Sequence, residues 1–347
     1  MVTMQDVAEK AGVRKSTVSY VLNGKHKKAR IADKTCERIK SIALELGYRR
    51  NELARSVAIG KSEVIAFVSN RAKTCEYIGE IIAGILDETT RQSYSLKIYH
   101  LQPDNSLNIS EQIISNRVDG VIFYSNNSQL QIINEEMKKF DIPCATVNLA
   151  SEATRVGVTT DDCQGVMDSV KHLTELGHER ILYLSHNTFT QSEYIIEREA
   201  GYRIGMQESL GKSAPLRIER LPQNYPENKI VIEKILSEPI NKRPSAIICI
   251  NDMDAMELLR LAYQAGIKIP EELSIIGFAD LEMAKYAIVP LTTVSQPFEK
   301  MGQITAKMLL EVIENRPTEK LPIKKLKLKT KLVVRQSTAP VNKLITI

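Results

Sequence analysis

Short apolar runs alternate with amphipathic helical patterns from Glu63 onward, and this alternation constrains the fold more than any other feature of the chain. Nearly continuous apolar runs are typical of parallel strands that are buried on both faces. Helical patterns between such strands indicate βαβ units and parallel sheets. The eight predicted strands are VIAFVS (64–69), LKIYHL (96–101), GVIFYS (120–125), CATVNL (144–149), ILYLSH (181–186), LRIERL (216–221), AIICIN (246–251) and LSIIGF (273–278).

Two groups of four strands favour two similar α/β lobes over one sheet. The separating helical patterns lie at 75–92, 130–140, 163–177, 198–211 and 253–266. Ligands of open parallel sheets bind beyond the carboxyl ends of the strands. Two lobes that face each other would therefore form a ligand-binding cleft.

The first 48 residues predict three short helices instead. Thr3 and Asp6 have the spacing of a capping box before the first helix. Gly12 permits a tight turn, the second helix runs to about Leu22, and the third ends at Gly47. A small residue, a turn glycine and an apolar residue at these spacings are typical of a helix-turn-helix.

The second helix has two chemically different faces within GVRKSTVSYVLNG (12–24). Val18, Val21 and Leu22 have the spacing of one buried helical face. Cations, hydroxyls and a phenol lie off that stripe, and the basic run GKHKKAR follows directly.

The basic charge of the chain is local. Residues 1–60 hold 13 Lys and Arg against 6 Asp and Glu, whereas the remainder holds 34 against 36. A balance of +7 on the head and −2 on the body indicates that only the head contacts a polyanion. Next to the head, RRNELARSVAIGKS is a short, weakly helical linker that is marginal on its own in water.

The remaining sequence features indicate a cytoplasmic binding protein. The five cysteines are scattered, which is typical of reduced thiols. We expect no secretory signal and no membrane span. No catalytic, cofactor-binding or metal-binding motif is present, and His172 and His178 are poorly spaced for a shared metal. We expect His178 to bond locally in the turn after Gly177.

Several motifs together resemble the lactose-repressor (LacI/GalR) family of bacterial transcription regulators. They are VTMQDVAEKAGVRKSTVSYVLNG, ELGYRRNELARS, HLTELGHERI, REAGYR, PSAIICINDMDAMELL, GIKIPEELSIIGF, PLTTVSQPFEKMG and LVVRQST. The resemblance implies an all-α helix-turn-helix head, a hinge helix, and an α/β core of two parallel-sheet lobes similar to periplasmic binding proteins. The implied boundaries are 1–48 for the head, 49–60 for the hinge, 61–161 plus about 291–323 for the N-terminal lobe, 162–290 plus about 324–338 for the C-terminal lobe, and 339–347 for the tail.

The resemblance also implies the residues that contact double-stranded DNA. Lys15, Ser16 and Tyr20 match positions that meet base edges in the major groove, where recognition helices present their first turns. The implied phosphate contacts are Thr17, Ser19, Asn23, Asn51 and Arg55. Val57 stands where the family usually has a leucine that wedges into the minor groove, so we expect a shallower wedge. Arg14 and Ala32 replace serines that usually cap helices.

A small-molecule effector site is implied between the lobes. The matching residues are Tyr77, Ser125, Asn126, Asn148, Asp162, Arg198, Asn251 and Asp252. Asp162, Asn251 and Asp252 could instead be helix caps, and Arg198 an ion-pair residue. Ala279 and Asn148 replace two acidic residues that are frequent in the family, which argues against a hexose bound in the usual way. An anionic ligand, a less hydroxylated one, or none remain open.

The sequence therefore predicts a DNA-binding transcriptional regulator, and a repressor in particular, that binds a pseudo-palindromic operator as a homodimer. An effector would shift the lobes between two arrangements and so change operator affinity. A regulator controlled by a protein co-effector or without a small ligand is the alternative. A solute-binding protein would share the lobes but lack the basic head.

Overall fold

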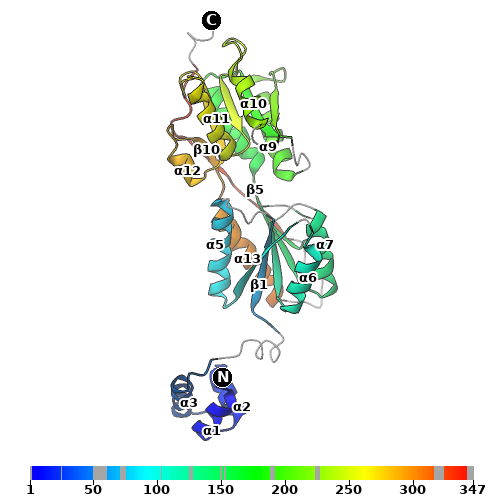
Figure 1. The fold of residues 1–347 in the computed structure, drawn as a ribbon, viewed down its shortest axis with the longest axis vertical. Helices are drawn as coiled ribbons and strands as arrows, with labels where there is room; N and C mark the ends of the chain where they lie inside the picture. The colour runs from blue at the N-terminus through cyan, green and yellow to red at the C-terminus, as the bar shows by residue number, and fades with distance from the viewer. Residues whose placement is uncertain are drawn as a thin grey trace. The chain divides into compact units, whose positions relative to one another are not determined.

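The computed structural model describes residues 2–24, 26–49, 61–70, 76–102, 104–124, 128–148, 151, 154–187, 192–222, 227–315 and 324–341 (Figure 1). The chain divides into two compact units, residues 1–62 and residues 63–347. Among the described helices none is long and apolar enough to cross a bilayer.

The first unit contains the three predicted helices, α1 (Met4–Ala11), α2 (Lys15–Leu22) and α3 (Asp33–Glu45). Its small core is formed by Val7, Ala8, Ala11, Val18, Val21, Cys36, Ile39 and Ala43. The Thr3–Asp6 capping box is confirmed, and Gly12 ends α1 in the left-handed region at φ 63°. The predicted helix-turn-helix is therefore present.

The second unit contains two sheets of six strands each, and all their strand pairs are parallel except β10 with β12. The first has the order β11-β5-β4-β3-β1-β2, with bounds β1 (Val64–Ser69), β2 (Ser95–His100), β3 (Gly120–Tyr124), β4 (Cys144–Val147), β5 (Val156–Thr160) and β11 (Lys324–Leu328). One face is covered by α5 (Glu76–Arg91) and α13 (Phe298–Glu314), and the other by α6 (Ser106–Ser115) and α7 (Ser128–Lys139) (Figure 1).

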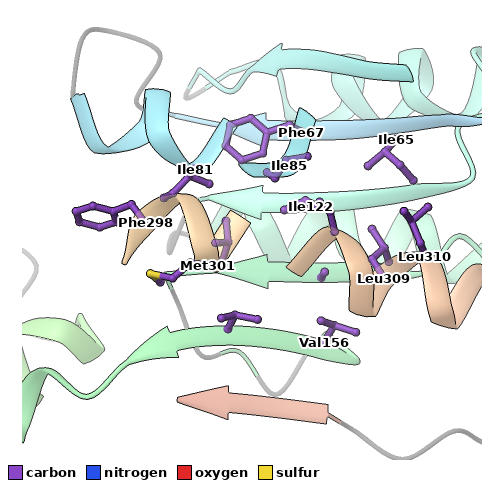
Figure 2. Close-up of a cluster of buried hydrophobic side chains, with 14 of the residues drawn as sticks. Ile65, Phe67, Ile81, Ile85, Ile122, Val156, Phe298, Met301, Leu309 and Leu310 are labelled. Carbon is purple, nitrogen blue, oxygen red and sulfur yellow. The ribbon is translucent and has the colours of Figure 1, made fainter. Parts of the chain in front are cut away.

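Figure 2 shows the apolar side chains between this sheet and α5 and α13. Ile65, Phe67 and Ile122 come from the strands, and Ile81 and Met301 come from the two helices. The two helices cross closely, because a Cβ on Gly84 or Gly302 would overlap backbone atoms of the opposite helix.

The second sheet has the order β12-β10-β9-β8-β6-β7, and β12 is its antiparallel member. Its strands are β6 (Ile181–His186), β7 (Arg217–Leu221), β8 (Ala246–Cys249), β9 (Ser274–Ala279), β10 (Thr292–Ser295) and β12 (Lys331–Val333). Its helices are α8 (Asp162–Glu175), α9 (Glu193–Leu210), α10 (Glu227–Leu236), α11 (Asp252–Gln264) and the short α12 (Glu282–Lys285).

The expectation of four strands per lobe was wrong, and so were two of the lobe boundaries. Residues 292–295 belong to the second sheet, because β10 pairs in parallel with β9 before the chain crosses to α13. Residues 324–328 belong to the first sheet, because β11 pairs in parallel with β5. Three segments therefore pass between the lobes: β5 to α8, β10 to α13, and β11 to β12.

Candidate functional site

Helix α2 presents its polar face to solvent. Val18 and Val21 are buried in the core of the first unit. Lys15 and Ser16 are exposed at the amino-terminal end, and Tyr20 is 47% exposed on the same side. The three side chains are placed to reach a ligand laid along the helix.

The start of α2 lacks a side-chain cap, as the sequence predicts. Arg14 occupies the N-cap position without a capping hydrogen bond, and Ala32 does the same before α3. The N–H groups of Lys15 and Ser16 make no hydrogen bond to the described residues, whereas those of Thr17 and Val18 donate to the Arg14 carbonyl. The first two can meet an anion, whose charge the helix dipole also favours.

Hydroxyl and amide groups flank the exposed face. Thr17, Ser19 and Asn23 are each half-buried. The Asn23 side-chain amide donates to Ser19 Oγ at 3.1 Å, which fixes both groups at the end of α2. Short polar side chains of this kind contact phosphate oxygens in protein–DNA interfaces.

The turn after α2 carries further cations, which are not among the predicted DNA contacts. Lys27, Lys28 and Arg30 are exposed. The Ile31 N–H donates to the carbonyl of His26 at 3.0 Å and closes the turn. The basic run GKHKKAR was the sequence signal for this part of the surface.

Five assigned residues lie outside the described part of the chain. Asn51, Arg55 and Val57 belong to the expected hinge, and Ser125 and Asn126 follow β3. Their assignments stay predictions.

The carboxyl edge of the first sheet carries an aromatic cluster. Tyr77 lies in the first turn of α5, and its ring centroid lies 5.2 Å from that of Phe298 and 6.0 Å from that of Tyr124. Asn148 has a left-handed backbone at φ 57°, and its amide donates to the Tyr124 hydroxyl at 3.4 Å. The structure thus brings Tyr77 and Asn148 to the same edge, on either side of Tyr124.

Arg198 is buried at the crossing between the lobes, and its guanidinium is held by several groups. Nε donates to Asp162 Oδ2 at 2.8 Å, Nη1 to the Ile250 carbonyl at 2.5 Å and Nη2 to Gln296 Oε1 at 3.3 Å. Its charge also lies over the Phe278 ring at 3.7 Å. Arg198 therefore forms the buried ion pair that was its alternative role.

Asp162 and Gln296 complete this network. Asp162 Oδ1 accepts from Thr160 Oγ1 at 2.6 Å and from Gln296 Nε2 at 3.2 Å. Gln296 Nε2 also donates to Thr160 at 2.6 Å. These buried groups join the segments β5–α8 and β10–α13 where they cross. Gln296 lies in the motif PLTTVSQPFEKMG but was not assigned a role, because its partners Arg198, Asp162 and Thr160 are distant in sequence.

Asn251 and Asp252 follow β8 and both make structural hydrogen bonds. Asn251 is the N-cap of α11 and accepts from the Asp254 N–H at 2.8 Å. Asp252 accepts from the Leu281 N–H at 2.8 Å and from the Thr293 hydroxyl at 2.5 Å. Burial raises the pKa of Asp252 to about 6, although these two donors oppose the shift.

The prediction that His178 bonds locally was wrong. Its ring nitrogens contact Ser245 Oγ and the Ala339 carbonyl, each at 3.0 Å, and both partners are distant in sequence. His178 therefore ties three segments at the amino ends of the second sheet. The described residues contain no cluster of His, Cys, Asp and Glu that could hold a metal ion.

Family models match both parts of the chain. Residues 3–51 match the bacterial regulatory proteins of the lacI family, and residues 170–338 match the periplasmic binding protein-like domain. The HTH-type transcriptional repressor PurR of Vibrio campbellii is 30% identical over 357 residues, covering 99% of this chain and 100% of the relative. The repressor of the same description from Vibrio cholerae is 31% identical over 334 residues, covering 92% of this chain and 94% of the relative.

Solved structures share the fold. A lac repressor dimer bound to operator and the anti-inducer ONPF has a TM-score of 0.80 at 23% identity, with 97% of this chain and 99% of that chain covered. A complex of the regulator CelR with cellobiose has a TM-score of 0.68 at 23% identity, with 97% and 100% covered. Because the whole length matches the curated relatives and the exposed face of α2 fits a DNA-reading helix, the chain belongs to the lacI family of bacterial regulatory proteins and is a DNA-binding transcriptional regulator, not an enzyme.

Proposed function

We propose that the protein is a repressor that reads a pseudo-palindromic operator with helix α2 of each subunit of a homodimer. The observation that carries this proposal is the exposed face of Lys15, Ser16 and Tyr20 above a buried face of Val18 and Val21. Lys15 can donate to guanine acceptors, and Tyr20 offers a hydroxyl and a ring to base edges. Thr17, Ser19 and Asn23, together with Asn51 and Arg55, are proposed phosphate contacts, and Val57 is the proposed minor-groove wedge.

An exposed apolar patch in the second unit supports the dimer. Met283, Tyr286 and Ile288 lie within six residues of one another, and Tyr286 and Ile288 are 77% and 87% exposed. Clustered apolar side chains at such exposure are typical of interaction surfaces. A dimer formed through this patch would supply two heads for two operator half-sites.

A small-molecule effector at the carboxyl edges of the two sheets is the proposed regulator of operator affinity. Tyr77 and Asn148 would contribute from the first lobe, and Arg198, Asp162 and the end of β8 from the second, with Ser125 and Asn126 completing the set. The three crossing segments support a movement of one lobe against the other. A regulator controlled by a protein co-effector or without a small ligand is the alternative, and it predicts that no small molecule changes the operator affinity of the purified protein.

The decisive experiment is selection of duplexes from a random library with the full-length protein, followed by binding measurements at two salt concentrations. We expect a two-fold related consensus whose affinity falls steeply with salt because phosphate contacts release counterions. Lys15→Ala or Tyr20→Ala should weaken binding to the consensus about tenfold or more, since a good base contact contributes about 1–3 kcal/mol. Lys40→Ala is the control, because it removes an exposed cation from α3. Absence of any consensus would refute the proposal.

A further inference from the structure

A histidine–aspartate pair lies at the carboxyl edge of the second sheet. His186 is the last residue of β6, and Asp254 is in the first turn of α11. His186 Nε2 lies 2.7 Å from Asp254 Oδ2, and the two side chains are 24% and 13% exposed. The pair is therefore partly shielded and still reachable from solvent.

Regular structure fixes both members. Leu182 and Leu184 of β6 pack in the apolar cluster shared with α11, and the period of two places His186 on the same face. The Asn251 cap accepts from the Asp254 N–H and sets the first turn of α11. Two rigid elements thus determine the distance between imidazole and carboxylate.

The carboxylate determines what the imidazole offers. A carboxylate can only accept, so Nε2 carries the proton that is shared with Asp254. In the neutral ring Nδ1 is then an acceptor with its lone pair directed away from Asp254. Nδ1 makes no hydrogen bond to the described residues. The pair therefore presents an oriented acceptor at the strand ends.

Two neighbouring arginines already have carboxylate partners. Arg198 pairs with Asp162, and Arg220 pairs with Glu199 at 2.7 Å. Ser185 also donates to Glu199 at 2.8 Å, which occupies the other oxygen of that carboxylate. An anionic ligand would have to compete with these internal carboxylates for the guanidinium groups.

We infer that His186, positioned by Asp254, is a specificity-determining contact for an uncharged effector that donates a hydroxyl or N–H group to Nδ1. The inference rests on the proposed effector function and assigns the chemical class of its ligand. Strands β9, β8 and β6 are neighbours, so the ends at Ala279 and His186 lie roughly 10 Å apart, a span that a sugar-sized ligand covers. Ala279 lacks the carboxylate that is frequent at this position in the family, and His186 Nδ1 would supply another acceptor on the same edge.

The test uses the full-length protein and calorimetry with four probes: ribose, cellobiose, hypoxanthine and glucose 6-phosphate. The variants are His186→Leu, which removes the acceptor, His186→Asn, whose amide oxygen restores one near Nδ1, and Asp254→Asn, whose amide no longer fixes the tautomer. Glu257→Gln is the matched control, since it makes the same carboxylate-to-amide change one turn further along α11, where Glu257 pairs with Arg260.

We expect an uncharged probe to bind, and His186→Leu to weaken that probe about tenfold, the equivalent of one lost hydrogen bond. His186→Asn should recover most of the affinity, Asp254→Asn should lose several-fold, and Glu257→Gln should match the wild type. A role limited to folding would move the unfolding temperature of the variants without this order of affinities. Preferred binding of glucose 6-phosphate, no binding of any probe, or wild-type affinity in His186→Leu would overturn the inference.

The selected operator duplex separates this inference from the proposed function. All variants should bind the duplex like the wild type when no probe is present, because the first unit is unchanged. Loss of duplex selectivity in the wild type refutes the proposed repressor. Intact selectivity with no effect at position 186 refutes only the inference about the ligand.

Discussion

At the scale of single residues, buried polar side chains make internal hydrogen bonds at positions where the sequence suggests ligand contacts. Asp252 and Arg198 sit in motifs associated with effector binding, yet their polar atoms are engaged inside the protein. A motif indicates that a polar group is needed at a strand end. Only three-dimensional neighbours show whether that group faces a ligand or another segment of the chain.

Replacement of Asp252 by alanine should destabilise the second unit by about 2–4 kcal/mol. The change leaves the Leu281 N–H and the Thr293 hydroxyl buried without their acceptor, and each such group costs about 1–3 kcal/mol. Asp252→Asn should cost less, because an amide can accept from Leu281 and donate to Thr293. Denaturant unfolding monitored by circular dichroism measures both, and equal losses would contradict this account.

His178 should make the stability of the second unit fall in weak acid. Burial lowers its pKa below the ordinary 6.5, so the unfolded chain takes up a proton at a higher pH than the native protein does. Its contribution is complete above pH 6.5 and declines as the pH falls toward the lowered native value. His178→Gln, whose amide can donate to Ala339 and accept from Ser245, should flatten this part of the dependence.

Urea unfolding between about pH 7.5 and about pH 5 measures the slope. His172, whose pKa burial also lowers, accounts for a further part of it, and Asp252, whose pKa burial raises to about 6, contributes a slope of the opposite sign. An unchanged slope in His178→Gln would show that the ring does not titrate differently in the folded state.

At the scale of elements, the patterns that depend on local sequence were predictable, including the edge strands β2 and β7, whereas β5, β10, β11 and β12 were not predicted. The capping box, Gly12 and the apolar stripe of α2 act within a few residues, so the sequence alone locates the helix-turn-helix. The predicted runs at 64–69 and 246–251 are central strands, buried on both faces, and they lie where the structure has β1 and β8.

The strands β11 and β12 show why two of the missed strands could not be predicted. KKLKL is almost entirely exposed and alternates lysine with leucine, and KLV is a half-buried strand of three residues, so neither forms the longer apolar run that marks a buried strand. They are strands because a neighbouring strand edge offers backbone partners, which is a tertiary effect. The same limit applied to the candidate site. The roles of His186 and Gln296 could not be predicted, because their hydrogen-bond partners are distant in sequence.

The crossing of α5 and α13 should be intolerant of a single methyl group. Gly84→Ala places a Cβ against the Glu299 carbonyl, and we expect a loss of about 1–3 kcal/mol. Gly79→Ala is the control on the same helix, because its Cβ would meet nothing within 4 Å. Better helix propensity should make that variant about 0.5 kcal/mol more stable. Thermal unfolding distinguishes the two, and similar effects would contradict the close crossing.

Capping of α2 should tighten the first unit. Arg14→Ser supplies the side-chain acceptor that the N-cap lacks, and we expect a gain of about 1 kcal/mol. Amide hydrogen exchange of α2, measured by mass spectrometry without DNA, should slow about fivefold, and Thr3→Ala should accelerate exchange in α1. Unchanged exchange in both variants would show that capping does not limit the opening of these helices.

At the scale of the whole molecule, the exposed patch around Ile288 should determine the oligomeric state. Ile288→Asp introduces a charge into the proposed contact and should convert the dimer into a monomer. Ile230→Asp is the control, because Ile230 is also exposed but lies on α10. Sedimentation equilibrium measures both, and the monomer should bind the selected operator far more weakly because it places only one head. A wild-type monomer would exclude this arrangement.

The exchange of strands between the lobes also determines the order in which the protein is completed during translation. The three helices that carry the candidate recognition face leave the ribosome first, whereas β11 and β12, the last strands of the two sheets, emerge almost three hundred residues later. A nascent chain thus holds a finished DNA-reading unit long before either lobe has its final edge. Translation that stops before Lys324 would release a head attached to two incomplete sheets. Such a product would keep the DNA-reading helix but lack the intact core that would regulate DNA binding.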